Sequence, residues 1–222
     1  MNILAIECTH AALSVAVKKA VEVTEVKSED WRKAAEALVP LIEEAMAQSG
    51  LDKQDLDSIA ISAGPGSFTS LRIGMSVAKG IAYGLGIPLI PVATMPAMAA
   101  SFLAGAGSVM AVIQARKGEY YYAVYSSEQL SSGVWHDDIQ RGSAIDVVTA
   151  AAKRGSVVVS RQLDELLPLL AGRGVVYAAA DFFSARSLLQ AAERLYERAD
   201  AAGLEGVDPD YRQMFMPHIG KR

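Results

Sequence analysis

The alternation of apolar and polar residues predicts three short strands at the start of the chain. Residues 2–7 and 12–17 are short apolar runs, and residues 21–26 alternate apolar with polar side chains, a pattern typical of strands joined by tight turns. Such hairpin connections are unusual for a simple doubly wound fold. They indicate a sheet that begins antiparallel and continues through crossovers.

A long amphipathic helix is expected next, over residues 31–48. Residues 28–30 supply N-cap candidates and acids suited to the positive end of a helix dipole, and residues 49–50 supply a stop. Pro40 lies inside the pattern and predicts a kink or local break, because proline has no N–H to donate. The apolar stripe of this helix comprises Trp31, Ala35, Leu38, Val39, Ile42, Ala45 and Met46.

The rest of the chain alternates strands and helices, as α/β proteins do. The expected further strands are residues 57–63, 89–92, 109–114, 120–125, one around Trp135, 157–160 and 175–178. The expected helices are residues 67–85, 94–103, 143–153, 163–170 and 182–199. We expect an N-terminal lobe over residues 1–104, a C-terminal lobe over 105–222, and a tail from residue 206 that lies over the surface or is loose.

Composition narrows the class of protein. The 222 residues are 51% apolar and 21% charged, which is typical of a soluble globular protein. The net charge of −4 argues against tight independent binding of nucleic acid, which usually requires a basic surface. Cys8 is the single cysteine, which suits a reducing compartment. Since neither a signal peptide nor an apolar run of ~18 residues is present, we expect a cytoplasmic protein without membrane contact.

The stretch GPGSFTSLRIG, residues 64–74, is the most distinctive motif. Its glycines permit unusual backbone angles, and the helix start offers free N–H groups and a positive dipole end to an anion. The motif lacks the Lys-Ser/Thr of a Walker loop and is not G-x-G-x-x-G, so a plain strand-to-helix turn is the alternative. The candidate anion-binding residues are Gly64, Gly66, Ser67 and Thr69.

The helix after this motif has two apolar faces and a narrow polar strip. Two apolar faces need two coverings: the protein's own sheet, and either its first long helix or a second protein. Glycines on the second face permit close approach of another helix. The first face comprises Phe68, Leu71, Met75, Ala78, Ala82 and Leu85. The second comprises Ile73, Val77, Gly80, Ile81 and Gly84.

Three blocks of the sequence, in order and spacing, resemble the TsaB (YeaZ) family. They are ILAI followed by the acidic Glu7, the motif at residues 64–74, and ARKGEYY at residues 115–121. The resemblance spans about the first 125 residues, and the stretch at residues 207–212 is also similar to the end of the family.

This resemblance implies an α/β, two-lobed actin/sugar-kinase-like (ribonuclease H-like) fold, with mixed sheets flanked by helices. It also implies a non-catalytic scaffold subunit for threonylcarbamoyl transfer to N6 of the adenosine next to the anticodon, in tRNAs reading codons that begin with A. The implied partners are a TsaD-like catalytic subunit and a TsaE-like ATPase, with tRNA reached only through the complex and a homodimer formed when the subunit is alone. No cofactor and no metal are expected.

The resemblance places the partner interface on the two long helices. The expected interface residues are Leu38, Ile42, Phe68, Leu71, Arg72, Met75, Ala78, Lys79 and Ala82. The chain departs from the family pattern in four places. The histidine that the family has near the first helix start is absent, with Trp31 or a neighbour in that region, and the second strand pair is shorter than usual. Residues 7–9 are Glu-Cys-Thr where Asp-Thr-Ser is usual, and Ser70 replaces a glycine. The longer Glu7 side chain weakens the case for the superfamily's metal and nucleotide site.

The sequence offers further candidates for phosphotransfer, metal binding, a thiol nucleophile and base stacking. A nucleotide-dependent phosphotransferase of the same superfamily needs an acid where Gln114 stands. A histidine metal site is not expected, because His10, His136 and His218 are far apart in sequence. Cys8 could be a nucleophile or a small residue at a strand end. The tyrosines at 120–122 could stack on bases or form a half-buried sheet face. A stand-alone homodimer remains a further alternative.

Overall fold

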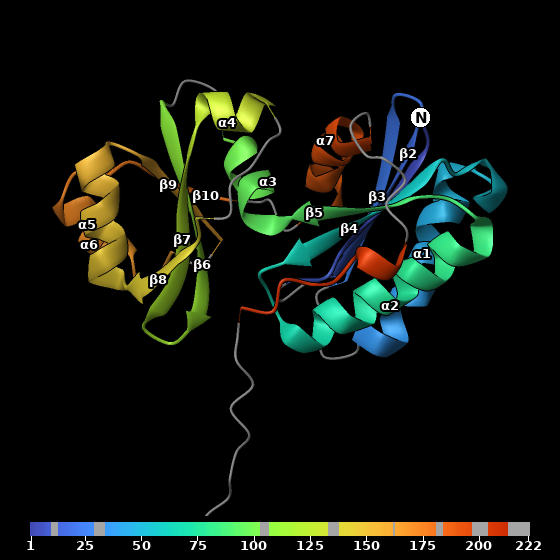
Figure 1. Ribbon diagram of the computed structural model, residues 1–222, viewed down its shortest axis with the longest axis horizontal. Helices are drawn as coiled ribbons and strands as arrows, with labels where there is room; N and C mark the ends of the chain where they lie inside the picture. Colours follow the sequence, from blue (N-terminus) through green and yellow to red (C-terminus); the bar gives the residue numbers. More distant parts are fainter. Residues whose placement is uncertain are drawn as a thin grey trace, which may run out of the picture.

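The computed structural model describes residues 1–9, 13–28, 34–102, 107–132, 138–161, 163–180, 184–196 and 204–212. Within them, two five-stranded mixed sheets lie next to each other, with helices on both faces of each (Figure 1). The strand orders are β3-β2-β1-β4-β5 and β10-β9-β6-β7-β8. This is the expected α/β fold with two flanked mixed sheets.

The first sheet begins antiparallel and continues with parallel crossovers, as the hydrophobic pattern predicts. β1 pairs antiparallel with β2 and parallel with β4, so Ile6 lies opposite Val15 on one side and Ile61 on the other. Each strand lies within a few residues of its expected range. The strands are β1 (Ile3–Glu7), β2 (Leu13–Lys19), β3 (Glu22–Ser28), β4 (Ser58–Gly64) and β5 (Leu89–Ala93).

Two long helices cover one face of this sheet, and a helix from the far end of the chain covers the other. The helices are α1 (Ala34–Ser49), α2 (Phe68–Leu85) and α7 (Ala185–Tyr196), and a short turn η2 (Lys53–Asp55) follows α1. Alternate side chains of β1 pack on opposite faces of the sheet: Leu4 and Ile6 pack with α1 and α2, whereas Ile3 and Ala5 pack with α7. The period-2 pattern of β1 therefore builds two separate cores.

α1 runs through Pro40 without a break, so of the kink or local break expected there the break is wrong. Pro40 is exposed and lies in the second turn of the helix. On that side, the carbonyl left without its N–H partner can bond to water, which lowers the cost of the proline. The start expected for this helix near Trp31 lies outside the described residues.

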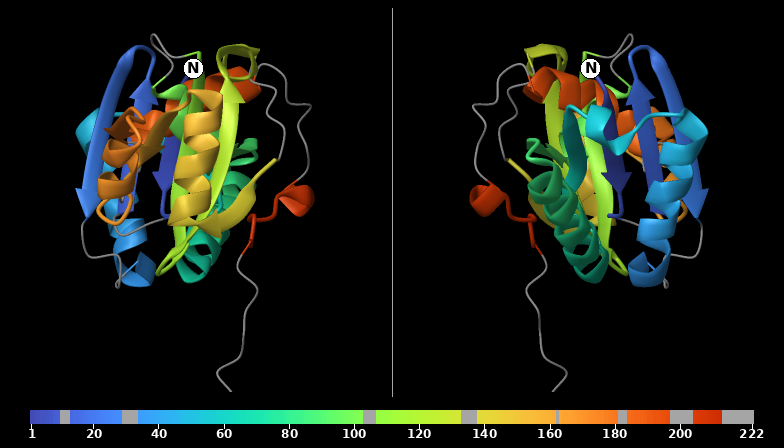
Figure 2. Two further views of the ribbon diagram at one scale, coloured as in Figure 1. Left: turned by 90° about the vertical axis from the view of Figure 1, so that its left-hand side faces the viewer. Right: turned by 90° about the vertical axis from the view of Figure 1, so that its right-hand side faces the viewer.

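The second sheet is covered on its outer face by α5 and α6 and on its inner face by α3 and α4 (Figures 1 and 2). α4 was not foreseen, and the strand expected around Trp135 lies outside the described residues. The strands are β6 (Ser108–Arg116), β7 (Glu119–Ser126), β8 (Gln140–Ser143), β9 (Val157–Ser160) and β10 (Tyr177–Ala179). The helices are α3 (Thr94–Ala100), α4 (Ser127–Ser132), α5 (Ala144–Arg154) and α6 (Leu167–Gly172).

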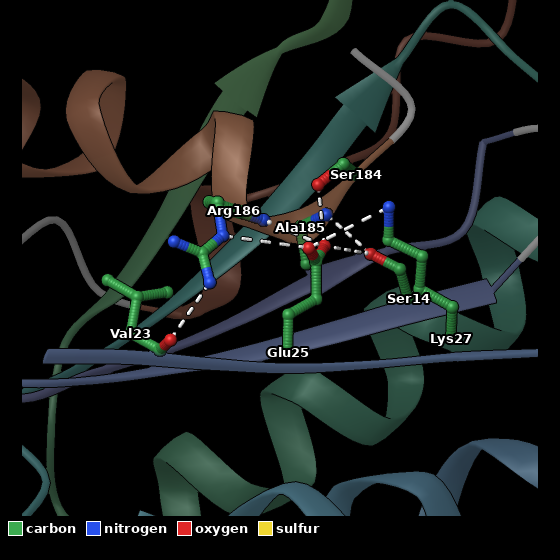
Figure 3. A network of polar contacts seen from close by, with 7 residues as sticks. All are labelled: Ser14, Val23, Glu25, Lys27, Ser184, Ala185 and Arg186. Carbon is green, nitrogen blue, oxygen red and sulfur yellow. Dashed lines mark hydrogen bonds and ion pairs between the residues drawn. The ribbon is translucent and has the colours of Figure 1, made fainter. Parts of the chain in front are cut away.

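A polar network around Glu25 ties α7 to the first sheet (Figure 3). The Glu25 carboxylate, on edge strand β3, accepts hydrogen bonds from Ser14 Oγ (3.0 Å), Ser184 Oγ (2.5 Å) and the backbone N–H of Arg186 (3.2 Å). It also faces Lys27 Nζ at 3.8 Å. A carboxylate at the positive end of a helix is favourable, and here it comes from a distant strand.

The halves of the chain are therefore not separate in space. All strands of the first sheet precede residue 104 and all strands of the second follow it, yet α7 returns to the first sheet. Residues 204–212, here called the C-terminal strap, also return; they begin with the turn η3 (Leu204–Gly206). Of the two alternatives expected for the tail, the strap lies over the first lobe rather than being loose, with Val207 buried in the core beneath α2. Residues 213–222 of the tail lie outside the described residues. None of the described helices is long and apolar enough to cross a membrane.

Candidate functional site

The glycines of the motif at residues 64–74 allow close approaches between segments. Gly64 has φ +102°, and a Cβ there would lie 2.9 Å from the backbone oxygen of Asp210. A Cβ on Gly66 would lie 2.6 Å from the backbone oxygen of Thr9. A Cβ on Gly74 would collide with Cys8 Sγ. Packing of α2 against β1 and the strap therefore accounts for all three glycines without any ligand.

The start of α2 borders a cleft between the two sheets. Its first N–H groups lack a side-chain cap, since Ser67 makes no capping bond and Ser70 Oγ donates to Ser67 Oγ instead. The cleft has a volume of about 380 Å³. Its lining residues are Gly66, Ser67, Phe68 and Thr69 from the first lobe and Ile113, Gln114 and Tyr121 from the second. None of these described lining side chains carries a charge.

The structure thus brings three of the four candidate anion-binding residues, Gly66, Ser67 and Thr69, to this cleft. Gly64 is buried beneath the strap and is not among the lining residues. Gln114 faces the same cleft from the second sheet, at the place where a phosphotransferase would need its second acid. Anion binding by this turn stays a prediction, and it rests on backbone N–H groups and hydroxyls alone.

Glu7, the acidic residue after the first strand, is fully buried beside this turn. Its Oε1 accepts hydrogen bonds from Thr9 N (2.6 Å) and from Thr9 Oγ1, whereas Oε2 has no hydrogen-bond partner among the described residues. Burial raises the pKa of the Glu7 carboxyl; hydrogen bonds from Thr9 and Ser62 and the charge of Arg161 oppose this only in part. Thr9, two residues further along the chain, therefore holds the carboxyl in place, while burial disfavours its ionised form.

We expect Glu7→Gln to stabilise the protein at pH 8 and to lose that advantage in acid. The raised pKa means that ionisation of Glu7 lowers the free energy of unfolding as pH rises from the ordinary value of 4.5. Glutamine, like the protonated acid, carries no charge, so the gain at pH 8 should be about 1–3 kcal/mol, the order of the cost of burying a charged group in place of a neutral one. Urea unfolding from pH 4 to pH 8 measures it.

Glu22→Gln on the exposed end of β3 is the matched control, and it should shift the free energy of unfolding by less than about 0.5 kcal/mol at every pH. A Glu7→Gln effect that does not change with pH, or that is destabilising at pH 8, would show that the buried carboxyl is not the titrating group.

The other chemical candidates occupy structural positions. Burial and the nearby Glu7 carboxylate raise the pKa of the Cys8 thiol, so a thiolate nucleophile is disfavoured. The tyrosines at 120–122 are at most 8% exposed, which leaves no stacking platform for bases. Tyr120 Oη donates to Glu165 Oε2 (2.7 Å) and Tyr121 Oη to the Arg212 carbonyl (2.8 Å). All three histidines lie outside the described residues.

The structure places most of the expected interface residues inside the first lobe. Six of the nine are at most 8% exposed, and of these only Ile42 also lines a surface groove: Leu38, Ile42, Leu71, Met75, Ala78 and Ala82. The other three lie along the strap. The Arg72 guanidinium lies 4.1 Å from the Phe68 ring centroid and 5.5 Å from that of Tyr211, and Lys79 Nζ lies 3.7 Å from Asp208.

Toward its C-terminal end, α2 leaves Gly80, Tyr83 and Gly84 exposed, and we call these three residues the outer face of α2. Ile73, Val77 and Ile81 of the second apolar face are half-buried and pack against the core of the first lobe. Tyr83 is 81% exposed, and apart from the helix itself no atom of the described residues lies within 4 Å of a Cβ built on Gly80 or Gly84. The glycine spacing was visible in the sequence. The sequence did not show that the glycines of the second apolar face stay exposed while its larger apolar residues pack against the core.

A groove between α1 and α2 adjoins this face. Its volume is about 840 Å³. Apolar side chains form most of its wall, and Glu43, Asp52 and Lys53 stand among them. The apolar lining residues are Leu4, Ile42, Met46, Ala47, Leu51, Leu56, Ile81 and Leu85. Together, the groove and the outer face of α2 form an apolar surface of the kind that marks protein–protein contacts.

Comparison with known proteins agrees with this architecture. Residues 26–166 match the family model "TsaD: tRNA N6-adenosine threonylcarbamoyltransferase". The chain is 37% identical over 134 residues to a protein of Haemophilus influenzae and 36% identical over 140 residues to one of Escherichia coli, both named "tRNA threonylcarbamoyladenosine biosynthesis protein TsaB". These matches cover 60% and 62% of the chain, and they span 57% and 60% of the relatives' length.

A solved structure of YeaZ from Pseudomonas aeruginosa superposes with a TM-score of 0.75 at 22% identity, covering 95% of this chain and 99% of that one. A second structure from the same organism, an uncharacterized protein with similarity to peptidase YEAZ, gives a TM-score of 0.76 at 23% identity over 96% of the chain and 99% of its own. These two likenesses establish the fold. The chain therefore belongs to the TsaD family as its model defines it, and within that family to the TsaB (YeaZ) group.

Proposed function

We propose that this chain is a non-catalytic subunit of tRNA threonylcarbamoyladenosine synthesis, which acts by docking a TsaD-like catalytic subunit. The observation that carries the proposal is the outer face of α2 with the adjoining groove. The names of the TsaB relatives support the pathway. The complex that we propose recruits a TsaE-like ATPase, meets tRNA through its partner and works in the cytoplasm.

Gly80 and Gly84 point to a helix as the docked element. Each glycine in a helix interior costs about 0.5–1 kcal/mol relative to alanine. An added methyl group would fit at both positions, since no other described part of the chain lies within 4 Å of a Cβ built there. A packed neighbour inside the chain therefore does not account for them. Close approach of another helix backbone does, and the exposed Tyr83 would supply its main apolar contact.

The interlobe cleft supports a non-catalytic role. A phosphotransferase needs charged groups around the nucleotide and its metal, and the described cleft residues supply only hydroxyls, backbone groups and the Gln114 amide. Calorimetry with ATP and magnesium tests this alternative directly. Clear one-to-one micromolar binding, together with turnover by the lone chain, would favour the enzyme over the scaffold.

The experiment that tests the proposed function is reconstitution. Mixed with the TsaD-like protein of the same organism, the chain should elute as a heterodimer on size-exclusion chromatography, and tRNA modification with the TsaE-like ATPase should require it. A chain that stays a homodimer in the presence of that protein, with modification proceeding equally in its absence, contradicts the proposal and favours a stand-alone role.

A further inference from the structure

The C-terminal strap touches both lobes at the mouth of the interlobe cleft. On the first lobe, Asp210 N donates to the Ala63 carbonyl at the end of β4 (2.7 Å), and the Tyr211 and Phe68 ring centroids are 4.8 Å apart. On the second lobe, Tyr121 Oη donates to the Arg212 carbonyl (2.8 Å). Since Tyr121 and Phe68 both line the cleft, the strap links its two walls.

α3 joins the lobes on the opposite side. It contacts β4 and β5 of the first sheet and β6 and β7 of the second. In Figure 1 it lies between the sheets in the upper part of the molecule, whereas the strap crosses from α2 toward the second sheet in the lower part. The two lobes are thus connected by a packed helix on one side of the cleft and by the strap on the other.

The strap is anchored firmly at one end and weakly at the other. Val207 is 5% exposed and belongs to the core under α2, with Leu204 packed beside it. Beyond it, the contacts are near the surface: the Asp208 side chain is 83% exposed and Tyr211 is 38% exposed. Single hydrogen bonds, ring contacts and exposed ion pairs contribute only about 1 kcal/mol each. Such a segment opens locally long before its lobe unfolds.

We propose that residues 208–212 form a detachable latch, anchored at Val207, that holds the two lobes closed across the cleft. When the latch opens, the Tyr121 wall is released from the Phe68 wall, and the second sheet is free to pivot about α3. The latch thereby sets how far the cleft opens. It is a property of the single chain and does not depend on the docking of a partner.

Amide hydrogen exchange in the full-length chain is the first test. The Asp210 amide should exchange faster than the amides of Ile59 and Val158, which donate to the Pro88 and Val176 carbonyls within the two sheets (3.0 and 2.9 Å). Tyr211→Ala should speed Asp210 exchange about tenfold, because it removes ring contacts with Phe68 and Arg72. Exchange at Ile59 and Val158 should not change. If Asp210 exchanges only as slowly as Ile59, the segment is a fixed part of the fold.

A second test asks whether the strap holds the two lobes together across the cleft. It combines the Tyr121→Phe substitution with a measured distance between the lobes. This substitution removes only the hydroxyl that bonds to Arg212, so it should speed Asp210 exchange about fivefold with the ring still buried. Spin labels at Ser76→Cys and Lys117→Cys, both exposed, report the separation of the lobes, and the buried Cys8 stays unlabelled.

Both Tyr211→Ala and Tyr121→Phe should shift the label distances to longer values, whereas Glu22→Gln, on the exposed end of β3 and outside the strap, should not. Faster exchange at Asp210 with unchanged label distances would overturn the latch, because the strap would then be an appendage of the first lobe. Unchanged exchange in Tyr121→Phe would do the same.

Discussion

Replacing Gly80 and Gly84 together by leucine should reduce the affinity for the TsaD-like subunit at least a hundredfold while the isolated chain stays folded. Both positions open to solvent in the free chain, so the new side chains meet no atom of their own protein within 4 Å of the Cβ. In the proposed complex they would stand where a partner helix approaches, and clashes of this size cost several kcal/mol. Calorimetric titration measures the affinity, and circular dichroism checks the fold.

Alanine at the same positions should stabilise the isolated chain and weaken its complex with the TsaD-like subunit. Gly80→Ala and Gly84→Ala should each raise the free energy of unfolding of the isolated chain by about 0.5–1 kcal/mol, the difference in helix propensity. They should nevertheless weaken the complex. A position that matters for stability alone would change the free energy of unfolding and the affinity for the partner in the same direction. Opposite changes in these two quantities therefore identify a surface that a partner covers.

Gly172→Leu on α6 is the matched control, because that glycine is also exposed with open space around it and lies on the second lobe. It should leave binding unchanged. Met75→Lys is the contrasting case: Met75 is 4% exposed in the core, so its replacement should unfold the first lobe and reveal nothing about the interface. Tight binding by the double leucine variant would show that the TsaD-like subunit does not dock on the outer face of α2.

Gly74→Ala should lower the free energy of unfolding by about 3 kcal/mol, at the upper end of the cost of overpacking a core. The added Cβ would collide with Cys8 Sγ, and both residues are buried where α2 crosses the end of β1. Neither the strand nor the helix can retreat without disturbing the core around Ile61, which lies 3.3 Å from the same Cβ. Urea unfolding at fixed pH measures the change.

The Cys8→Ala background should remove most of this cost. Without the sulfur, Cys8 Cβ lies 3.4 Å from the new methyl group, close to ordinary contact, and a double-mutant cycle should show a coupling of about 2 kcal/mol. Gly80→Ala on the same helix is the control for helix propensity, and it should stabilise the chain. If Gly74→Ala costs as much with alanine at position 8 as with cysteine, the sulfur contact is not the reason for the glycine.

Local pattern was enough to predict most of the secondary structure. Short apolar runs predict β1, β4 and β9, whose residues are nearly all buried, and the motif at residues 64–74 places the start of α2 within a residue. α4 and the unbroken path of α1 through Pro40 were missed. Helix propensity and proline rules are local, whereas packing on a sheet decides short or imperfect helices.

The sequence by itself determined the alternating strands and helices, the antiparallel start of the first sheet, the TsaB-like blocks, and the fact that α2 carries two apolar faces. The tertiary structure alone decided how those faces are covered. The face at Leu71, Met75 and Ala78 packs on the first sheet, whereas the other face is half-buried at Ile73 and Val77 and leaves Gly80 and Gly84 exposed. It also decided that α7 and the strap return to the first sheet, through the Glu25 carboxylate and the Ala63 carbonyl. The physical reason is the same in each case. Periodicity records that a surface must be buried, but its partner is fixed only by contacts between residues far apart in the chain.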